Sequence, residues 1–339
     1  MRLYPKWGGV KVIAVSMRTH IYPEYNSINN ILLFPLKLLY HFVVNHKAFQ
    51  QICTISKYYK PDVVYTNVSV IGVGQKVAEK IKVPHIYHIR EYQYLDFGMR
   101  IIPSSSTFKR MLQNQYSICI TKGIQSHFGL NNQNSVVIYD GVRSEDVAFF
   151  DKRKEKYFLF VGRLDKTKGV RIVLEAFAKS RIRTHTLKIA GASLSKNEDN
   201  QLKELVKEYG IEDRVEFLGV VNDVDSIMRK ATALVMASQF EGFGLVTAEA
   251  MFNGCLVIGR NVAGTKEQFD NGLKWTGDEI GMRWNSVDEL RQCMNNVVEN
   301  GIESYYPYIE RGIKACKHYS IEQNALKIKE YLKFVIGNQ

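Results

Sequence analysis

The stretch Glu241-Gly-Phe-Gly-Leu-Val-Thr-Ala-Glu249 follows closely after the apolar run Ala233-Leu-Val-Met-Ala237. The apolar run predicts a buried strand, and residues 244–253 predict a helix that Gly254 can end in the left-handed conformation. A helix that begins at the end of a strand directs backbone N–H groups to a position where a phosphate can bind, and carboxylates beside it suit sugar hydroxyls. The stretch therefore predicts an α/β unit with a pocket for a sugar nucleotide.

The rest of the second half repeats this order of strand and helix. Apolar runs predict strands that alternate with helices, and such alternation implies a parallel sheet with crossover helices. The predicted strands are 157–161, 186–190, 214–218 and 255–258, and the predicted helices are 170–180, 196–209 and 223–230. From Ser286 onward we expect mainly helix, with separate helices over 301–318 and 321–336.

The first half shows the same alternation less regularly. Strands are predicted at 10–15, 62–66, 84–89, 117–120 and 136–138, and helices at 31–59 and 70–82. The polar stretch 103–107 is typical of a turn. The charged segment between Gly141 and Lys156 is the best candidate for a linker. We therefore predict two doubly wound domains, 1–150 and 151–318, with residues 319–339 packing back on the first.

Composition narrows the class of protein. The 339 residues exceed what one hydrophobic core usually serves. Five cysteines without a close pair argue against a disulfide framework or a zinc knuckle, so we expect a cytoplasmic protein without a metal. No apolar run reaches the roughly 18 to 20 residues that span a bilayer, and the start of the chain lacks the apolar region of a signal peptide.

Charge is unevenly distributed. Residues 1–150 contain 17 Lys and Arg against 8 Asp and Glu, and the remainder contains 29 against 26. The first half therefore favours anionic partners. Within it, the run 31–44 is apolar on more than one helical face and is followed by His46 and Lys47, which indicates either peripheral contact with an anionic membrane or a buried helix with a solvated basic end.

The loop after the strand 157–161 carries two cations. In Gly162-Arg-Leu-Asp-Lys-Thr-Lys-Gly169, Gly162 allows a ligand to approach the backbone, while Arg163 and Lys168 can contact a pyrophosphate. Because Lys and Arg are common in such loops, a solvated surface turn is an equally good interpretation of this loop alone.

Two further loops complete the candidate site. Glu241 and Glu249 could simply favour the start of the helix electrostatically, but Gly242 and Gly244 around Phe243 have poor helix propensity, which favours a ligand site. After the strand 255–258, Gly264 and Thr265 offer backbone and hydroxyl donors to a phosphate. Ligands of open α/β sheets bind at the edge where all three loops lie.

Together, Gly-Arg-Leu with Lys-Gly at 162–169, the two glutamates seven residues apart around Gly-Phe-Gly, and the glycine loop at 264 resemble the retaining glycosyltransferases of family 4. The resemblance covers 155–275. It implies the GT-B fold, in which two Rossmann-like domains face each other across a cleft and the second domain holds a nucleotide sugar.

Carried over by position, the resemblance implies a role for each residue. Arg163 and Lys168 would bind the donor diphosphate, and Glu249 the ribose hydroxyls. Glu241 would contact the transferred sugar, and Gly242, Phe243 and Gly244 would give it backbone contacts. Such enzymes work without a metal or another cofactor, because cations and a helix dipole replace the divalent ion.

The first half departs from this family. The loop after the strand 84–89 would supply a group close to the reacting sugar, and the candidates are His88, Arg90 and Glu91, with His88 equally suited to a core-facing position. Residues 1–9 are too short for the strand, glycine loop and helix with which members begin, so we expect a shortened N-terminus. Gly8 and Gly9 could serve a reduced version of that loop.

These observations favour transfer of a sugar from a UDP- or GDP-sugar, with UDP-sugar preferred, to a lipid-linked or saccharide acceptor during capsule or lipopolysaccharide synthesis. A sugar-nucleotide epimerase of the same fold, or a non-catalytic protein that binds nucleotide sugars or nucleic acid, is the alternative. No helix-turn-helix or aromatic RNA-binding motif supports the nucleic-acid reading.

Overall fold

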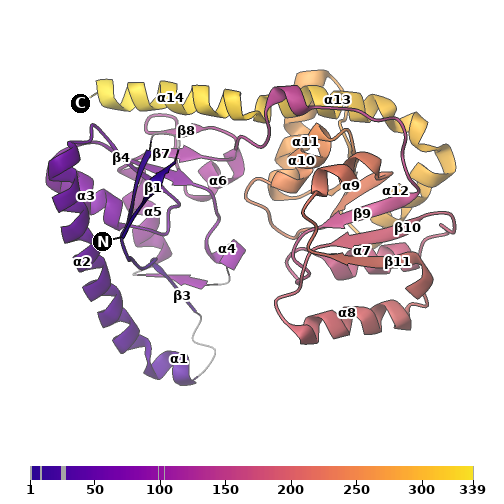
Figure 1. The fold of residues 1–339 in the computed structure, drawn as a ribbon, viewed down its shortest axis with the longest axis horizontal. Helices are drawn as coiled ribbons and strands as arrows, with labels where there is room; N and C mark the ends of the chain where they lie inside the picture. The colour runs from indigo at the N-terminus through magenta and orange to yellow at the C-terminus, as the bar shows by residue number, and fades with distance from the viewer. Residues whose placement is uncertain (1, 8–9, 24–27, 98, 103, 339) are drawn as a thin grey trace. The chain divides into compact units, whose positions relative to one another are not determined.

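The fold was obtained as a computed structural model, which describes residues 2–7, 10–23, 28–97, 99–102 and 104–338 (Figure 1). Contacts divide the chain into two units. Unit 1 contains residues 1–138 and 328–339, and unit 2 contains residues 139–327. The segment 139–150, which the sequence analysis assigned to the first domain, is therefore grouped with the second unit.

Unit 2 is built on a six-stranded parallel sheet with the order β11-β10-β9-β12-β13-β14. Numbered along the chain, this is the order 3-2-1-4-5-6 of a Rossmann fold. Apolar residues make the central strands fully buried, which is typical of a parallel sheet covered on both faces. The strands are β9 Tyr157–Val161, β10 Thr186–Ala190, β11 Val215–Gly219, β12 Ala233–Met236, β13 Leu256–Arg260 and β14 Met282–Trp284.

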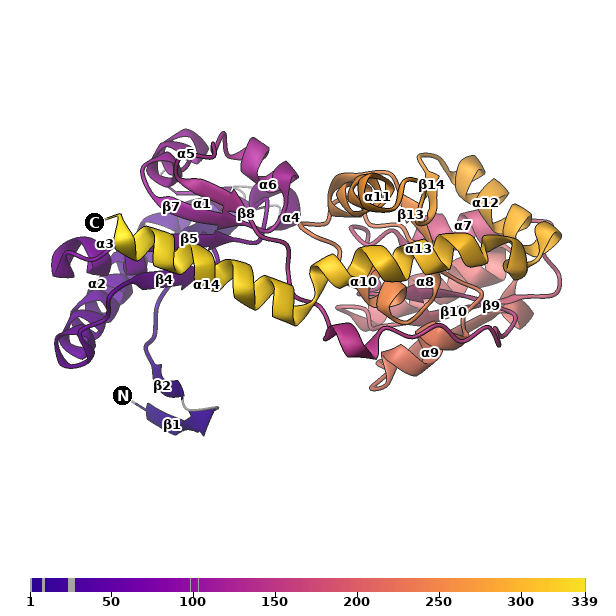
Figure 2. The same ribbon diagram turned by 90° about the horizontal axis from the view of Figure 1, so that it is seen from above.

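Helices connect these strands. α7 packs against α12, and α10 and α11 pack against α13 (Figures 1 and 2). Gly254, at φ 59°, takes the predicted left-handed position after α10. The helices are α7 Val170–Ala178, α8 Lys196–Glu208, α9 Val224–Lys230, α10 Leu245–Phe252, α11 Ala263–Thr276, α12 Val287–Asn300 and α13 Tyr306–Cys316. Short 3-10 helices lie at Glu145–Val147, Glu212–Arg214, Ile302–Tyr305 and Lys317–Tyr319.

Unit 1 contains a four-stranded parallel sheet with the order β4-β5-β7-β8. Ile86, Ile118 and Ile138 form its core beneath the last helix. The strands are β4 Val64–Asn67, β5 His85–Ile89, β7 Tyr116–Cys119 and β8 Ser135–Val137. The helices of this unit are α1 Ile28–Leu32, α2 Phe34–Tyr59, α3 Val73–Ile81, α4 Tyr94–Phe97, α5 Ser105–Gln113 and α6 Lys122–His127.

The last helix, α14 Ile321–Gly337, returns to unit 1. Ile328, Tyr331, Leu332 and Val335 pack against the core of the four-stranded sheet. The predicted return of the C-terminal helix to the first domain is thus confirmed from Ile328 onward, whereas residues 319–327, which were also expected to pack there, group with unit 2. The prediction of an α/β fold with parallel sheets is confirmed. None of the described helices is long and apolar enough to cross a membrane.

Several elements near the N-terminus differ from the prediction. The strand predicted at 10–15 is present as β2 Val10–Ala14, but it pairs antiparallel with β1 Arg2–Trp7 and is not part of the parallel sheet. β3 Ile21–Pro23 and β6 Met99–Ile101 form a second, unpredicted antiparallel pair. Their length explains the miss, because three residues are too few for a hydrophobic pattern. Gly8 and Gly9 lie outside the described residues.

The turn predicted at 103–107 is wrong from Ser105 onward, where α5 begins. The Ser104 hydroxyl caps this helix by accepting a hydrogen bond from the Thr107 N–H at 3.2 Å. Phe108 and Leu112, four residues apart, are the buried face of the helix. The serine N-cap and the apolar pair at helical spacing indicate a helix. The polar composition of residues 103–107 suggested a turn instead.

Candidate active site

Two loops of unit 2 lie at the point where the strand order reverses. β9 and β12 are neighbours in the sheet, but the chain proceeds from β9 toward β10 and β11 and from β12 toward β13 and β14. Such a switch point leaves an opening at the carboxyl ends of the two strands, which is where open α/β sheets bind their ligands. The loop 162–169 follows β9 and the loop 237–244 follows β12, so both of them border this position.

The two loops are in close contact. Gly169, at φ 76°, lies so near β12 that a Cβ there would be 2.2 Å from the Ala237 carbonyl oxygen. The Gln239 N–H donates to the Thr167 carbonyl at 2.8 Å. Only glycine combines this backbone angle with this proximity, so the position fixes how the two loops align.

The predicted cation and carboxylate face each other across these loops. Lys168 Nζ lies 2.6 Å from Glu241 Oε1, and the Ser238 hydroxyl donates to the same oxygen at 2.7 Å. The side chains are 26% and 18% exposed, so the ion pair is accessible to a ligand but partly shielded from water. The structure thus brings together two residues that the sequence placed in one site.

Asp165, which the sequence analysis did not single out, organises the first loop. Its Oδ1 accepts hydrogen bonds from the Thr167 N–H at 2.9 Å and the Lys168 N–H at 3.1 Å, and its Oδ2 lies 3.2 Å from Arg163 Nε. Although burial raises the pKa of Asp165, the hydrogen bond from the Thr167 hydroxyl, the two backbone bonds and the Arg163 charge outweigh it and lower the pKa below the ordinary value. An aspartate two residues before a backbone donor is the signal for such a turn.

Gly162 and Arg163 begin that loop. The Gly162 N–H donates to the Ala190 carbonyl at 3.0 Å, and a Cβ on Gly162 would meet only ordinary contacts, with Lys168 Cγ at 3.8 Å. The Arg163 side chain is 57% exposed and held by Asp165. Arg163 is therefore a surface cation in a fixed loop, and its role toward a ligand stays a prediction.

The glycine turn before α10 presents its backbone and not its aromatic ring. Phe243 is buried in a cluster with Tyr139 and Tyr319, whose ring centroids lie at 6.1 Å and 5.0 Å. Its carbonyl accepts from Gln268 Nε2 at 2.6 Å. Gly244, at φ 87°, directly precedes α10. Because the ring is in the core, the predicted contacts to a sugar can come from this turn only through backbone atoms.

Gly264 and Thr265 lie beneath this turn. A Cβ on Gly264 would be 2.3 Å from the Phe243 carbonyl oxygen, and its N–H donates to the Glu241 carbonyl at 3.0 Å. Thr265 is buried, with its hydroxyl 3.4 Å from that of Thr247. These contacts give both residues a supporting function beneath the 241–244 turn. Their predicted direct contact with a phosphate stays a prediction.

Glu249 lies in α10 beside two residues that the sequence did not connect with it. Arg143 Nη2 is 3.2 Å from Glu249 Oε1 and 3.2 Å from Asp225 Oδ1. The Asn253 amide donates to the same Asp225 oxygen at 2.9 Å. Burial raises the pKa of Asp225, but the bonds from Asn253 and Arg143 lower it overall. No local pattern could reveal this group, because it joins three distant segments.

In unit 1, His88 is a core residue of β5. Its Nδ1 lies 2.5 Å from the Tyr65 hydroxyl, and its buried Nε2 has no hydrogen-bond partner among the described residues. Burial, with a smaller contribution from the nearby Arg90, lowers the pKa of His88 to about 4. The imidazole is therefore neutral at physiological pH, and its predicted catalytic function stays untested by this geometry.

The loop after β5 is organised around Glu91. This buried carboxylate accepts from the Ser69 N–H at 2.9 Å, from the Ser69 hydroxyl at 2.6 Å and from the Arg90 N–H at 3.1 Å. Gln93 donates to the Ser69 hydroxyl at 2.8 Å. Val68, at φ 105°, is in a strained conformation for a β-branched residue. Strain and a buried carboxylate often mark functional positions, which favours Glu91 and Arg90 among the three candidates that the sequence offered on this side.

Comparison with known proteins identifies the class. Residues 143–314, just over half of the chain, match the model of the family described as glycosyl transferases group 1. The chain belongs to this family of glycosyltransferases. Every residue of the donor-side candidate site lies within the matched segment.

Three curated relatives show the range of similarity. An uncharacterized glycosyltransferase of Methanocaldococcus jannaschii is 26% identical over 265 residues, which cover 76% of this chain and 70% of the relative. A relative of Campylobacter jejuni is 32% identical over 59% of this chain and 55% of its own length. Its name is N-acetylgalactosamine-N,N'-diacetylbacillosaminyl-diphospho-undecaprenol 4-alpha-N-acetylgalactosaminyltransferase. Mannosylfructose-phosphate synthase of Agrobacterium fabrum is 38% identical over 53% of this chain and 49% of its own length. The chain thus spans about half the length of the last two.

Solved structures share the fold. HepE of Anabaena in complex with UDP aligns with a TM-score of 0.73 at 20% identity, covering 85% of this chain and 82% of HepE. Sucrose-phosphate synthase of Thermosynechococcus elongatus aligns with a TM-score of 0.74 at 16% identity, covering 99% and 86%. This likeness, with the parallel sheets of both units, confirms the predicted GT-B fold with Rossmann-like domains.

Proposed function

We propose that this protein is a retaining glycosyltransferase of family 4 that transfers a sugar from a UDP-sugar to a lipid-linked or saccharide acceptor in the synthesis of a cell-surface polysaccharide. The observation that carries the proposal is the Lys168–Glu241 ion pair at the switch point of the unit 2 sheet. A GDP-sugar is the alternative donor.

The ion pair suggests how donor binding begins. In the absence of a ligand, Glu241 neutralises Lys168 at 2.6 Å. A donor diphosphate carries more negative charge than one carboxylate, so it competes for Lys168 and releases Glu241 toward the sugar. Arg163 adds a second cation, and the N-terminus of α10 adds its partial positive charge. We propose that these groups stabilise the leaving diphosphate without a metal ion.

Glu249 is suited to the ribose of the donor. A carboxylate can accept hydrogen bonds from two vicinal hydroxyls, and Arg143 fixes the Glu249 carboxylate through Oε1 at 3.2 Å. Arg143 is itself fixed by Asp225. We assign Arg143 as a positioning residue for Glu249, because a fixed acceptor loses less freedom when the ribose binds.

The proposed transfer breaks one bond and forms another at the same face of the sugar. The acceptor hydroxyl oxygen attacks the anomeric carbon while the bond from that carbon to the diphosphate oxygen breaks. The acceptor proton passes to the departing diphosphate. Because the new bond forms on the face that the diphosphate leaves, the anomeric configuration is retained. Glu241 faces the transferred sugar, and the backbone of Gly242, Phe243 and Gly244 orients it. His88 and Arg90 are proposed on the acceptor side.

The named relatives support the choice of substrates. HepE is described in complex with UDP and with UDP-glucose, and the Campylobacter relative is named for an acceptor linked to diphospho-undecaprenol. A polyprenyl acceptor lies in a membrane, so we propose that the protein works in the cytoplasm at the inner membrane face.

α2 supports membrane contact. Leu36, Leu39, Tyr40 and Val43 are all exposed, and their spacing places them on one face of the helix. Lys47 lies exposed one turn further. An exposed apolar stripe beside a basic residue is suited to the surface of an anionic bilayer.

The decisive experiment supplies UDP-sugars with and without a polyprenyl-diphosphate saccharide acceptor and follows UDP release. We expect release only with the acceptor, and an α-linked product from an α-linked donor by NMR. Formation of an epimer without the acceptor would overturn the transferase assignment, and a β-linked product would overturn retention. Activity that EDTA removes and Mg²⁺ restores would overturn metal independence.

A further inference from the structure

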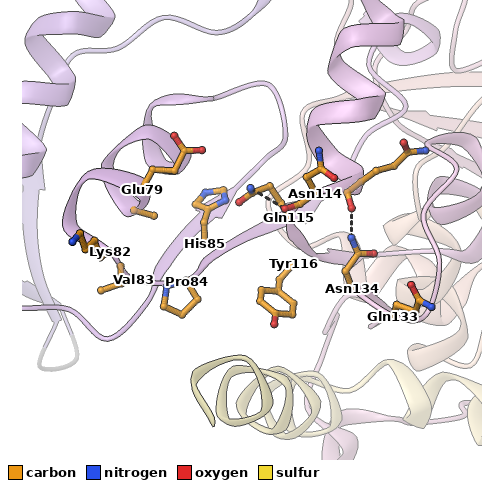
Figure 3. Close-up of a pocket in the computed structure, with 12 residues that line it drawn as sticks. Glu79, Lys82, Val83, Pro84, His85, Asn114, Gln115, Tyr116, Gln133 and Asn134 are labelled. Carbon is orange, nitrogen blue, oxygen red and sulfur yellow. Dashed lines mark hydrogen bonds between the residues drawn. The ribbon is translucent and has the colours of Figure 1, made fainter. Parts of the chain in front are cut away.

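Unit 1 contains a pocket at the amino ends of its parallel strands, whereas the candidates His88 and Arg90 lie at the carboxyl end of β5 (Figure 3). Its volume of about 480 Å³ lies within the range of roughly 300 to 1,000 Å³ that is typical of ligand pockets. His85, the first residue of β5, and Tyr116, the first residue of β7, form part of the wall. His88 lies three residues further along β5, about 10 Å by strand geometry.

The lining is rich in side-chain amides from two segments. Gln113, Asn114 and Gln115 come from the end of α5 and the turn before β7, and Gln133 and Asn134 come from the turn before β8. The Asn134 amide donates to the Gln113 carbonyl, and Gln115 Nε2 donates to the Asn114 carbonyl at 3.0 Å. The two segments are therefore linked to each other, which gives the pocket a preformed wall.

The wall is also anchored to the last helix. The Tyr331 hydroxyl of α14 donates to the Asn134 carbonyl at 2.9 Å, and the rings of Tyr116 and Phe334 meet edge to face at 6.4 Å. A ligand would thus meet amides whose backbone is already ordered, which reduces the entropy lost on binding.

One buried polar atom of the wall lacks a partner. His85 is 4% exposed, and its Nε2 lies 2.8 Å from the Thr66 hydroxyl. Its Nδ1 makes no hydrogen bond of ordinary geometry within the described residues, and the Gln115 side chain interacts with the ring only weakly. Because a buried polar atom without a partner costs stability, a ligand that completes this hydrogen bond gains from it. Burial lowers the pKa of His85, the Gln115 side chain opposes this shift in part, and the resulting pKa of about 4 leaves the imidazole neutral.

The charges of the pocket favour a neutral ligand. Glu79 and Lys82 are exposed at the rim and balance each other, and they are the only charged residues among those that line it. A phosphate site would need more cations than one lysine. Amides both donate and accept hydrogen bonds, as sugar hydroxyls do, and the Tyr116 ring offers an apolar surface for the C–H face of a pyranose.

We propose that this pocket binds a neutral saccharide unit at a site where no transfer takes place. The site goes beyond the proposed glycosyl transfer and does not depend on it. A saccharide chain that binds here is held on the protein at high effective concentration. A nucleoside is the competing ligand, because its base edges also pair with amides. The pocket favours it less, since the Tyr116 ring gives a base only one surface to stack on.

The test measures binding of maltotriose, chitotriose and mannotriose to the full chain by saturation-transfer NMR and calorimetry. At least one should bind, and Asn114→Ala with Gln133→Ala should weaken its affinity by roughly tenfold or more, because two amides are lost. Both residues are exposed, so the change should leave the fold intact. Gln51→Ala, an exposed amide of α2, is the control and should change affinity less than about twofold.

A second variant tests the charge of the ligand. Lys82 ends α3 at φ 58°, where glycine is favoured, so Lys82→Gly removes the charge without straining the backbone. Unchanged saccharide affinity in this variant supports a neutral ligand.

Absence of binding by every trisaccharide at concentrations on the order of 10 mM would overturn the proposal. So would saccharide binding insensitive to the double substitution, or uridine or inorganic phosphate binding that is sensitive to it. None of these outcomes depends on transfer activity.

Discussion

Lys168 and Glu241 are 73 residues apart in sequence, and yet Lys168 Nζ lies 2.6 Å from Glu241 Oε1. Adjacent strands produce this contact, because β9 and β12 end at the same edge of the sheet. The two side chains neutralise each other, and the Ser238 hydroxyl also donates to Glu241 Oε1. A ligand that binds between them must supply an anion for the lysine and hydroxyl donors for the glutamate, and a nucleotide sugar supplies both.

The first prediction separates these two roles. Lys168→Ala should weaken UDP binding by roughly 10- to 100-fold, because a charge-assisted contact with the diphosphate is lost. Glu241→Ala should slow transfer, while UDP affinity stays equal or rises as Lys168 is released. Calorimetry with UDP and an assay of turnover measure the two effects. Lys166→Ala, an exposed lysine of the same loop, is the control. Equal UDP affinity in Lys168→Ala and wild type would contradict the assignment.

The second prediction concerns Glu249 and the ribose. Wild-type protein should bind UDP more tightly than 2′-deoxy-UDP by roughly 10-fold, and Glu249→Ala should abolish this preference, because the partner of the missing hydroxyl is gone. Arg143→Ala should reduce the preference partly, since it leaves the carboxylate but releases it. Glu204→Ala on α8 serves as the exposed control. A preference that survives in Glu249→Ala would place the ribose elsewhere.

The strands of unit 2 could be predicted because buried parallel strands appear as continuous apolar runs. Tyr157–Val161 is an example that the structure reproduces residue for residue. β14, with three residues, is too short to give such a signal. β2 was recognised as a strand, but its partner could not be predicted, because pairing depends on residues outside the strand.

The candidate site divides in the same way. Lys168 and Glu241 could be placed together from sequence, since each follows a strand and parallel strands share an edge. Arg143 and Asp225 could not, because their contact with Glu249 depends on how three distant segments fold together. Gly264 was recognised as unusual, but only the structure shows that its lack of a side chain makes room for the Phe243 carbonyl.

That close approach gives a third prediction. Gly264→Ala would place a Cβ 2.3 Å from the Phe243 carbonyl oxygen, so the 241–244 turn must shift. We expect a loss of about 1 to 3 kcal/mol in the free energy of unfolding, typical of overpacking, together with weaker UDP binding. Urea unfolding followed by the fluorescence of Trp275 and Trp284 measures the stability of unit 2. Gly337→Ala, where an added Cβ would meet no atom of the described residues within 4 Å beyond the local helix backbone, should be nearly neutral.

The fourth prediction concerns acid. Burial lowers the pKa of His85 and of His88 from 6.5 to about 4. At pH values between about 4 and 6.5 the unfolded chain binds protons at these imidazoles and the folded chain does not. The free energy of unfolding that they contribute at pH 7 is therefore lost as the pH falls from about 6.5 to about 4. The loss is roughly 3 kcal/mol for each imidazole.

Pulse proteolysis at a series of pH values, with unit 1 peptides identified by mass spectrometry, tests this dependence. His88→Asn keeps an acceptor near the Tyr65 hydroxyl and should flatten the slope by roughly a third or less, because burial also lowers the pKa of His20 in the same unit to about 4. His46→Gln changes an exposed histidine and should leave the slope unchanged. A pH dependence that is the same in His88→Asn and wild type would contradict the explanation.

The fifth prediction tests the membrane surface proposed for α2. Leu36 and Val43 are exposed on one face of the helix, and Leu36→Glu with Val43→Glu replaces apolar surface by negative charge. We expect binding to vesicles of anionic phospholipid to fall by roughly 10-fold or more, since both apolar burial and charge attraction are lost. Val220→Glu introduces the same charge at an exposed valine of unit 2 and should change binding little. Cosedimentation with vesicles measures the effect, and turnover of a water-soluble acceptor should stay unchanged in the double variant. If Val220→Glu reduced vesicle binding as strongly as the α2 substitutions, general electrostatics would explain the binding and α2 would not be the contact surface.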